Sequence, residues 1–275
     1  MVNSINTNVG AMIALQNLNS INADLATTQN RISTGLRVAS AKDDGATYAI
    51  AQRERIQVSS LDAVKDSLSR TSSSIDVALS AGESISDLLS QLRQKALAAS
   101  DTSLDTTARS AIRDDFVSIR SQITKTLSLA NFNGVNLLDG SRPSTSALAD
   151  ASGTNRLTVA AQNMSLGGSI ITLSAAASFA SATDASRLIS SLDASIDNVS
   201  SALASLGTAS NALATHLTFV GKLQDTLTAS IGNLVDADVA RESANLQSLQ
   251  VKQQLAVQAL SIANHAQDYL LQLFR

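Results

Sequence analysis

The chain has 275 residues, of which 44% are hydrophobic but only 3% aromatic, and its formal net charge is −3. With five Phe, two Tyr and no Trp, it lacks the large side chains that usually fill a thick core. The absence of Cys excludes disulfides, thiolate catalysis and Cys-ligated zinc. The net charge is small and the basic residues are scattered along the chain, which argues against binding to nucleic acid. A single Pro permits long helices, so the composition predicts extended helices rather than a globule around a central core.

The first apolar pattern lies near the N-terminus, and polar residues interrupt it. Its positions alternate four and three residues apart: Ala11, Leu15, Leu18, Asn22, Leu25, Gln29, Ile32 and Leu36. Such a heptad stripe places one narrow face on a helix and requires a partner helix. Because polar residues weaken this stripe, we expect the segment to be ordered by association.

Three further stripes have the same spacing and are more apolar. The longest consists of Leu61, Val64, Leu68, Thr71, Ile75, Ala78, Gly82, Ile85, Leu89, Leu92, Ala96 and Ala99. A shorter one consists of Ile112, Phe116, Ile119, Ile123, Thr126 and Ala130. The third consists of Leu192, Ile196, Val199, Leu203, Leu206, Ser210, Leu213, Leu217, Val220, Gln224, Leu227, Ile231 and Leu234. Polar residues 100–103 and cap candidates 105–107 separate the first two, so we expect a helical hairpin that joins the third helix in one bundle.

The heptad pattern stops after residue 130. Asn133-Gly134 and Asp139-Gly140 are turn pairs, and residues 157–159 and 170–173 are short β-prone runs. Residues 141–153 contain the only Pro and much Ser, Thr and Ala, which is typical of an exposed loop. The segment is therefore predicted to be a small β-hairpin region.

The final stripe resembles the first in its spacing and its polar interruptions. It consists of Leu246, Leu249, Gln253, Ala256, Leu260, Ala263, Gln267, Leu270 and Phe274. Polar residues at such positions can specify the register and the assembly state of a coiled coil. We therefore expect both ends of the chain to take part in association.

No cluster of residues predicts catalysis, a cofactor or a metal. Asp43 and Asp44 are adjacent, so on a helix they would point about 100° apart, and a solvated turn is favoured over a metal site. Asp236, Asp238 and Glu242 precede or begin the last stripe, where capping of a helix N-terminus is favoured. No His-Glu-x-x-His or Gly-x-Ser-x-Gly motif occurs. The chain is predicted not to be an enzyme.

Several motifs carry a family resemblance. They are residues 4–8, 31–37, 40–44, 131–135, 233–238 and 258–264. In these motifs the sequence resembles the bacterial flagellins. The resemblance implies a mainly α fold, with a long-helix bundle, a small β-hairpin region and terminal helices that form a coiled coil on assembly. Compared with larger members of the family, the chain has no room for large outer domains.

The resemblance also implies a division of the chain into four segments. Residues 1–44 are expected to form an N-terminal coiled-coil segment and connector, and residues 45–180 a helical core with the β-hairpin. Residues 181–235 are expected to form the return helix of the core, and residues 236–275 the C-terminal coiled-coil segment.

The implied function is that of a structural subunit that polymerises into the flagellar filament for motility. The implied location is the extracellular bacterial flagellum, after secretion. Expected partners are other copies of the chain, the flagellar export apparatus and a chaperone, the filament cap and the hook-junction proteins, with no nucleic acid and no membrane span. Two alternatives remain, a hook-filament junction protein with flagellin-like ends and a cytoplasmic signalling coiled coil.

Three groups of residues are expected to make contacts in an assembly. The inner coiled-coil contacts are assigned to Leu15, Leu18, Leu25, Ile32, Leu246, Leu249, Leu260, Leu270 and Phe274. Contacts of the connector are assigned to Arg31, Lys42, Asp43 and Asp44. A switch region in the hairpin is assigned to Phe132, Asn133, Gly134, Leu137 and Leu138.

Overall fold

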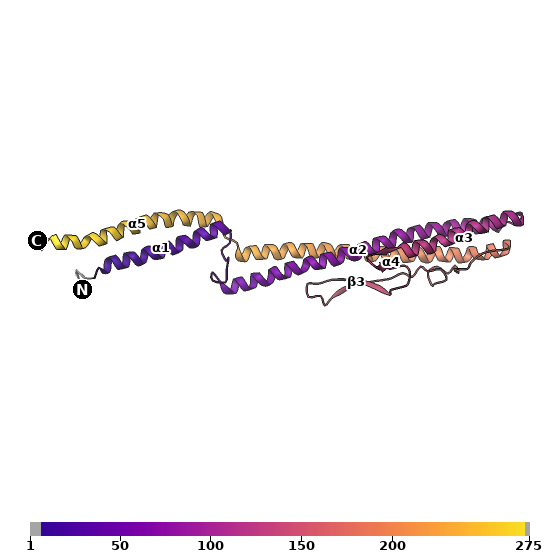
Figure 1. Ribbon diagram of the computed structural model, residues 1–275, viewed down its shortest axis with the longest axis horizontal. Coiled ribbons are helices and arrows are strands. Elements are labelled where there is room, and N and C mark those ends of the chain that lie inside the picture. Colours follow the sequence, from indigo (N-terminus) through magenta and orange to yellow (C-terminus); the bar gives the residue numbers. More distant parts are fainter. Residues whose placement is uncertain (1–6, 273–275) are drawn as a thin grey trace. The chain divides into compact units, whose positions relative to one another are not determined.

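The structure is a computed structural model that describes residues 7–272, with side-chain surroundings up to residue 265. The described elements, in chain order, are α1 (Val9–Thr34), α2 (Gly45–Ala99), α3 (Thr106–Leu129), β1 (Asn131–Phe132), β2 (Val135–Asn136), β3 (Ser144–Leu148), β4 (Arg156–Ala160), α4 (Ala182–Val235) and α5 (Val239–Gln272), as Figure 1 shows. The fold is therefore mainly α with a small hairpin region, as the sequence predicted. Contacts divide the chain into one unit of residues 57–225 and another of residues 1–56 with 226–275.

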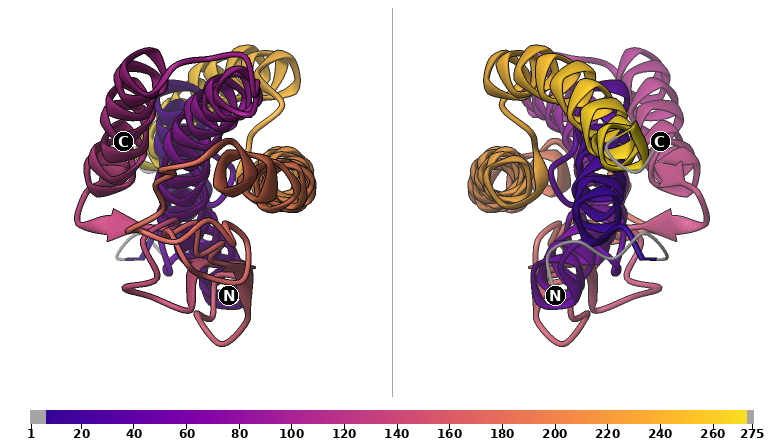
Figure 2. Two further views of the ribbon diagram at one scale, coloured as in Figure 1. Left: turned by 90° about the vertical axis from the view of Figure 1, so that its right-hand side faces the viewer. Right: turned by 90° about the vertical axis from the view of Figure 1, so that its left-hand side faces the viewer.

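The unit of residues 57–225 is a helical bundle in which α2, α3 and α4 run side by side (Figures 1 and 2). All twelve positions of the longest predicted stripe, from Leu61 to Ala99, are buried. Aliphatic side chains make up most of the core, and an edge-to-face pair of Phe116 and Phe179 with ring centroids 5.3 Å apart lies within it. The apolar residues thus form a narrow seam along the bundle rather than a thick core.

Polar contacts and one close approach fix the helices of this bundle. Arg93 of α2 pairs with Asp193 of α4, and the Lys95 Nζ of α2 lies 2.6 Å from the Asp115 Oδ2 of α3. A Cβ at Gly82 of α2 would lie 2.6 Å from the Cδ2 of Leu203 on α4. The absence of a side chain at Gly82 therefore lets the two helices approach each other.

The ends of α2 and α3 are joined by a capped turn. The Asp105 side chain accepts a hydrogen bond from the Ala108 N–H at 2.6 Å, which satisfies a free donor at the start of α3. The Arg109 guanidinium donates to the carbonyls of Ala99 and Asp101 at 3.1 and 2.8 Å. Arg109 thereby binds the carbonyls at the end of α2 and closes the hairpin that the sequence predicted.

Two antiparallel hairpins follow α3. In the first, β1 and β2 are joined by Asn133 and Gly134, whose φ values of 50° and 77° match a tight two-residue turn. In the second, β3 pairs with β4 from Ser144↔Ala160 to Leu148↔Arg156. The second hairpin includes residues 157–159, which the sequence predicted to be β-prone.

The structure corrects two predictions in this region. Residues 141–153 are not a continuous exposed loop, because residues 144–148 form β3, in which Ala147 is buried and the Leu148 N–H donates to the Ser67 Oγ of α2 at 3.0 Å. Residues 170–173 do not form a strand. The Thr172 N–H donates instead to the buried Ser195 Oγ of α4 at 3.1 Å, so a helix side chain replaces a neighbouring strand as the acceptor.

Candidate subunit interface

Helices α1 and α5 lie side by side and run antiparallel (Figure 1). The Asn8 Nδ2, just before α1, donates to the Ala263 carbonyl at 2.8 Å. Further along, the Gln253 Nε2 donates to the Asn22 Oδ1 at 2.7 Å. Residue numbers therefore rise along α1 as those of the contacted residues fall along α5. These contacts bring together the two ends of the sequence.

The side of α5 that packs on α1 follows the predicted stripe. Its less exposed positions are Leu246, Leu249, Gln253, Ala256, Leu260 and Ala263. In α1 the corresponding positions are Ala11, Ala14, Leu18, Ile21, Leu25, Thr28 and Ile32. The prediction was therefore right for Ala11, Leu18, Leu25 and Ile32. It was wrong between them, where the packed residue lies one position before the predicted residue.

The error in α1 has a geometric cause. Leu15, Asn22 and Gln29 are exposed, and Leu15 retains 48% of its surface. The row of Ala11, Leu18 and Leu25 can be completed by residues three or four positions further on, and both choices give a heptad pattern. Ala14, Ile21 and Thr28 complete the packed row against α5.

The assigned coiled-coil residues therefore have different surroundings. Half-buried positions along the α1–α5 pair are occupied by Leu18, Leu25, Ile32, Leu246, Leu249 and Leu260. Leu15 lies on the exposed side of α1. The side chain of Leu270 and the whole of Phe274 lie outside the described residues.

One side of the pair carries a groove whose character changes along its length. The part near Gly10 and Ala263 has a volume of about 610 Å³ and is lined mainly by apolar or small side chains, including Ile13, Ile21 and Leu255. The next part along the same helices has a volume of about 310 Å³ and is lined mainly by polar residues. The Lys252 side chain lines both parts. The groove thus offers apolar contact at one end and hydrogen-bonding groups at the other.

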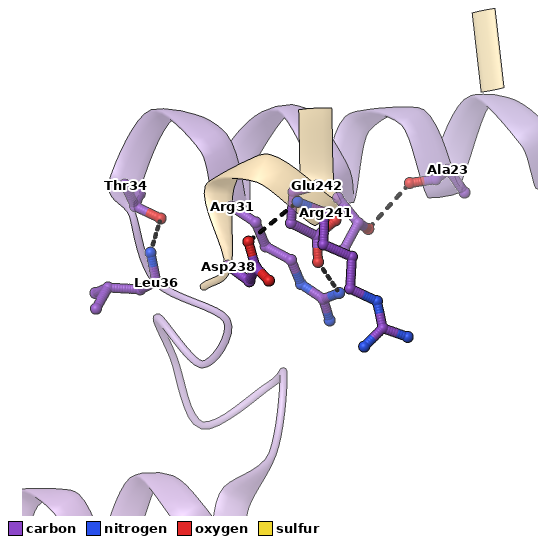
Figure 3. Close-up of polar contacts among 8 residues, drawn as sticks. Ala23, Arg31, Thr34, Leu36, Asp238, Arg241 and Glu242 are labelled. Atoms are coloured by element: carbon purple, nitrogen blue, oxygen red, sulfur yellow. Dashed lines mark hydrogen bonds and ion pairs between the residues drawn. The ribbon is translucent and has the colours of Figure 1, made fainter. Parts of the chain in front are cut away.

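An ion pair lies at the polar end of this groove. The Arg31 Nη1 of α1 is 3.3 Å from the Glu242 Oε1 of α5 (Figure 3). Glu242 is only 8% exposed, and the Arg31 Nε is buried without a hydrogen-bond partner among the described residues. Asp238 caps α5 by accepting from the N–H groups of Ala240 and Arg241. Capping at the start of α5 is therefore confirmed for Asp238, whereas the Glu242 carboxylate binds Arg31.

The Asp43 carboxylate caps a turn in the connector between α1 and α2, and the Asp44 carboxylate caps the start of α2. The Ser40 and Ala39 N–H groups donate to the Asp43 Oδ2 at 2.8 and 3.1 Å, and the hydrogen bond from Ser40 contributes most to holding the pKa of Asp43 below its usual value. The Thr47 hydroxyl and N–H donate to Asp44, which lowers the pKa of that carboxyl too. Lys42 is exposed. Among the described residues no cluster of metal-ligating side chains occurs.

The connector also contains contacts that the sequence analysis missed. Leu36 and Asp236 form an isolated antiparallel bridge, and the Arg37 N–H and guanidinium donate to the Val235 and Leu234 carbonyls at 2.7 and 2.6 Å. Val38, Ala51 and Val235 form a small buried apolar cluster beside this bridge. The available signal in the sequence for this cluster was Val38, the one large apolar residue in the run 37–44. The segment that joins α1 to α2 is therefore held to the segment that joins α4 to α5.

The assigned switch residues fall into two groups. Asn133 and Gly134 form the exposed turn, and Phe132 beside them is half-buried. Leu137 and Leu138 are buried, and their carbonyls accept hydrogen bonds from Gln162 and Met164 at 2.7 Å. The second group therefore belongs to the core of the bundle.

None of the described helices is long and apolar enough to cross a membrane.

Comparison with known proteins identifies the family to which the chain belongs. The family model of the bacterial flagellin N-terminal helical region matches residues 5–143, and that of the bacterial flagellin C-terminal helical region matches residues 189–274. The chain belongs to the bacterial flagellins. Its similarity to curated flagellins extends over its whole length.

Two relatives come from Caulobacter vibrioides. Flagellin FljM is 55% and flagellin FljK 54% identical over 274 residues, which are 100% of this chain and 99% of each relative. A flagellin of Brucella melitensis is 36% identical over 285 residues, covering 99% of both chains. The crystal structure of Bacillus cereus flagellin superimposes with a TM-score of 0.50 at 24% identity, over 56% of this chain and 88% of that one, which supports the fold.

Family membership decides the broad function. Flagellins are structural proteins and not enzymes, and this flagellin is a structural subunit of the flagellar filament, which serves motility. The family polymerises with itself and forms the extracellular filament. Full-length similarity to named flagellins favours the filament subunit over a junction protein or a signalling coiled coil.

Proposed function

We propose that α1 and α5 form the part of this flagellin that packs against α1 and α5 of neighbouring copies in the filament. The observation that carries the proposal is the set of large apolar side chains that the pair leaves about half exposed or more. They are Val9, Met12, Ile13, Leu15, Val251, Leu255, Val257 and Ile262. Apolar surface gathered on one part of a protein is typical of an interaction site.

The energy available at this surface is large enough for assembly. Covering a half-exposed Val, Leu or Ile contributes roughly 1 kcal/mol, because complete burial contributes about 1.5–3 kcal/mol. Half-buried Leu18, Leu25 and Leu260 hold the two helices of one copy together, and their remaining surface adds to the same contact. In our proposal Ile32, Leu246 and Leu249 have the same role.

The polar groups of the pair contribute orientation rather than energy. The polar end of the groove next to Arg31 and Glu242 accepts only a neighbour whose polar groups match it. In our proposal Lys42, Asp43 and Asp44 make connector contacts with other copies, which the exposure of Lys42 and Asp43 permits. The hairpin region from Phe132 to Leu138 is assigned to changes of filament shape. Its exposed Asn133-Gly134 turn next to buried Leu137 and Leu138 supports this assignment.

The proposed route to the filament is that of the family. The chain is secreted through the flagellar export apparatus with the help of a chaperone, and it is added beneath the filament cap beyond the hook-junction proteins. The α1–α5 pair suits this route because Thr28 is the buried residue of α1, so separating the two helices exposes little core.

Seeded growth of filaments tests the proposal. Leu255→Asp places a charge in the apolar part of the groove, and Gln250→Asp places the same charge on the same helix at an exposed polar position. We expect Leu255→Asp to stop growth from wild-type seeds and Gln250→Asp to reduce it less, while amide hydrogen exchange shows that both variants keep the bundle of residues 57–225. Normal filaments from Leu255→Asp would contradict the proposal.

A further inference from the structure

The sulfur atoms of this chain are few and unequally exposed. The sequence has three Met and neither Cys nor Trp. Of the two Met residues within the described part of the chain, Met164 is 0% exposed and Met12 is 63% exposed. Met1 lies outside the described residues. Oxidation of Met follows the exposure of its thioether, and this chain has no thiol that would react first.

Met164 is shielded by the bundle. Its Cε lies 3.5 Å from the position that a Cβ would take at Gly82, where α2 approaches Leu203 of α4. The Met164 N–H donates to the Leu138 carbonyl at 2.7 Å, which fixes the backbone beside it. An oxidant in solution therefore reaches Met12 and not Met164 while the bundle is folded.

Met12 is part of an apolar row on α1. Val9 and Leu15, three residues before and after it, are its neighbours on the helix surface and are 53% and 48% exposed. This row of Val9, Met12 and Leu15 lies outside the packed positions Ala11 and Ala14. It belongs to the surface that the proposed function places against other copies.

The helix end that carries the row is held in place. The Asn8 Oδ1 accepts a hydrogen bond from the Ala11 N–H at 2.9 Å and caps α1. The Asn8 Nδ2 donates to the Ala263 carbonyl of α5 at 2.8 Å. The thioether is thus presented on an anchored helix, and a change in its polarity acts directly on the surface around it.

We propose that Met12 is a site of reversible oxidation by peroxide-class oxidants, and that its sulfoxide prevents the free subunit from joining a filament. The inference rests on the proposed function of the α1–α5 pair. Hydrogen peroxide transfers one oxygen atom to the Met12 Sδ: its O–O bond breaks, an S–O bond forms, the sulfur gives up two electrons and water is released. The product is a polar sulfoxide, which a methionine sulfoxide reductase returns to the thioether.

The consequence for assembly follows from polarity. Covering an apolar thioether in a contact between copies stabilises the contact. Covering a sulfoxide oxygen destabilises it, because the oxygen must lose its bound water. Assembly also covers Met12 and so protects it. Free subunits are therefore sensitive to the oxidant, and subunits within a filament are resistant.

The first test measures oxidation itself. Free subunits and intact filaments are treated with hydrogen peroxide, and peptide mass spectrometry follows the gain of one oxygen atom at Met12 and at Met164. We expect Met12 of free subunits to react at least about tenfold faster than Met164, and at least about tenfold faster than Met12 of filaments. Equal rates at Met12 in free subunits and filaments would overturn the inference.

The second test measures seeded growth of oxidised subunits, with circular dichroism as a check on folding. We expect oxidation to slow growth of the wild type at least about tenfold, and reductase treatment to restore it. Met12→Leu keeps the apolar row without the thioether, so it should grow normally after peroxide. Met164→Leu removes the shielded sulfur instead and should stay as sensitive as the wild type.

The outcomes separate this inference from the proposal on which it rests. If untreated Leu255→Asp grows like the wild type, the proposed function of the α1–α5 pair fails. If Leu255→Asp is blocked but subunits oxidised at Met12 grow like untreated ones, only the role of Met12 fails. Loss of growth in peroxide-treated Met12→Leu would also overturn it, because another residue would then be responsible.

Discussion

Arg31 and Glu242, which are 211 residues apart in the sequence, form an ion pair of 3.3 Å between α1 and α5. Glu242 is nearly buried, and Asp238 caps the start of the same helix (Figure 3). The pair is the polar link between the two ends of the chain next to the connector. Its contribution to the helix pair is therefore testable separately from that of the apolar residues.

Replacement of Arg31 should loosen α1 and α5 specifically. Arg31→Ala leaves the Glu242 carboxylate buried without its cation, which we expect to cost about 1–3 kcal/mol, less than for a fully buried pair because the Arg31 side chain is 35% exposed. Amide hydrogen exchange should become faster in α1 and α5 and remain unchanged in the bundle of residues 57–225. Gln29→Ala, an exposed position on the same helix, is the control and should change exchange little. Unchanged protection in Arg31→Ala would show that the ion pair does not stabilise the two helices.

Gly82 should tolerate a side chain less well than an open helical glycine. In Gly82→Ala the new Cβ meets the terminal Cδ2 of half-buried Leu203 at 2.6 Å, so Leu203 must move aside and we expect this variant to be about 1–3 kcal/mol less stable than Gly207→Ala. Gly207→Ala in α4 is the matched control, because no atom lies within 4 Å of its Cβ position. It should be stabilised by about 0.5–1 kcal/mol. Thermal unfolding of both variants checks the difference, and equal melting temperatures would contradict the close approach of α2 and α4.

The turns of the connector should depend on pH. The pKa values of Asp43 and Asp44 are lowered, mainly by hydrogen bonds from Ser40 and from Thr47, so both carboxylates bind protons more weakly in the folded chain than in the unfolded chain. Their contribution to stability is therefore fully present above the ordinary Asp value of 3.8 and is lost as the pH falls through the lowered values. Carbon-13 NMR titration of the carboxyl groups checks this. Midpoints at or above the ordinary value would contradict the capped turns.

The heptad spacing predicted the part of α2 from Leu61 to Ala99 because that part is packed along its length, whereas residues 45–60 of the same helix lie outside the predicted stripe. Every position of its stripe is buried, so the period of the apolar residues and the period of contact coincide. In α1 only one side of a sparse stripe contacts α5, and spacing does not distinguish Leu15 from Ala14. The contact there depends on which side of α1 faces α5, and the spacing alone allows either choice.

The connector and β3 could not be predicted for a different reason. The bridge between Leu36 and Asp236 and the hydrogen bonds of Arg37 to the Val235 and Leu234 carbonyls join residues about two hundred positions apart. No local pattern records such a contact. Likewise, β3 is rich in Ser and Thr and is defined by its pairing with β4 and by Ser67 of α2 rather than by its own apolar residues.

The measurement that tests the central proposal most directly is a structure of the assembled filament by electron cryomicroscopy. We predict that the exposed apolar side chains of the α1–α5 pair, above all Val9, Met12, Leu255 and Ile262, are mostly covered there by α1 and α5 of neighbouring copies. If these side chains stay as exposed as in the single chain and neighbouring copies meet through the bundle of residues 57–225 alone, the proposed interface is wrong.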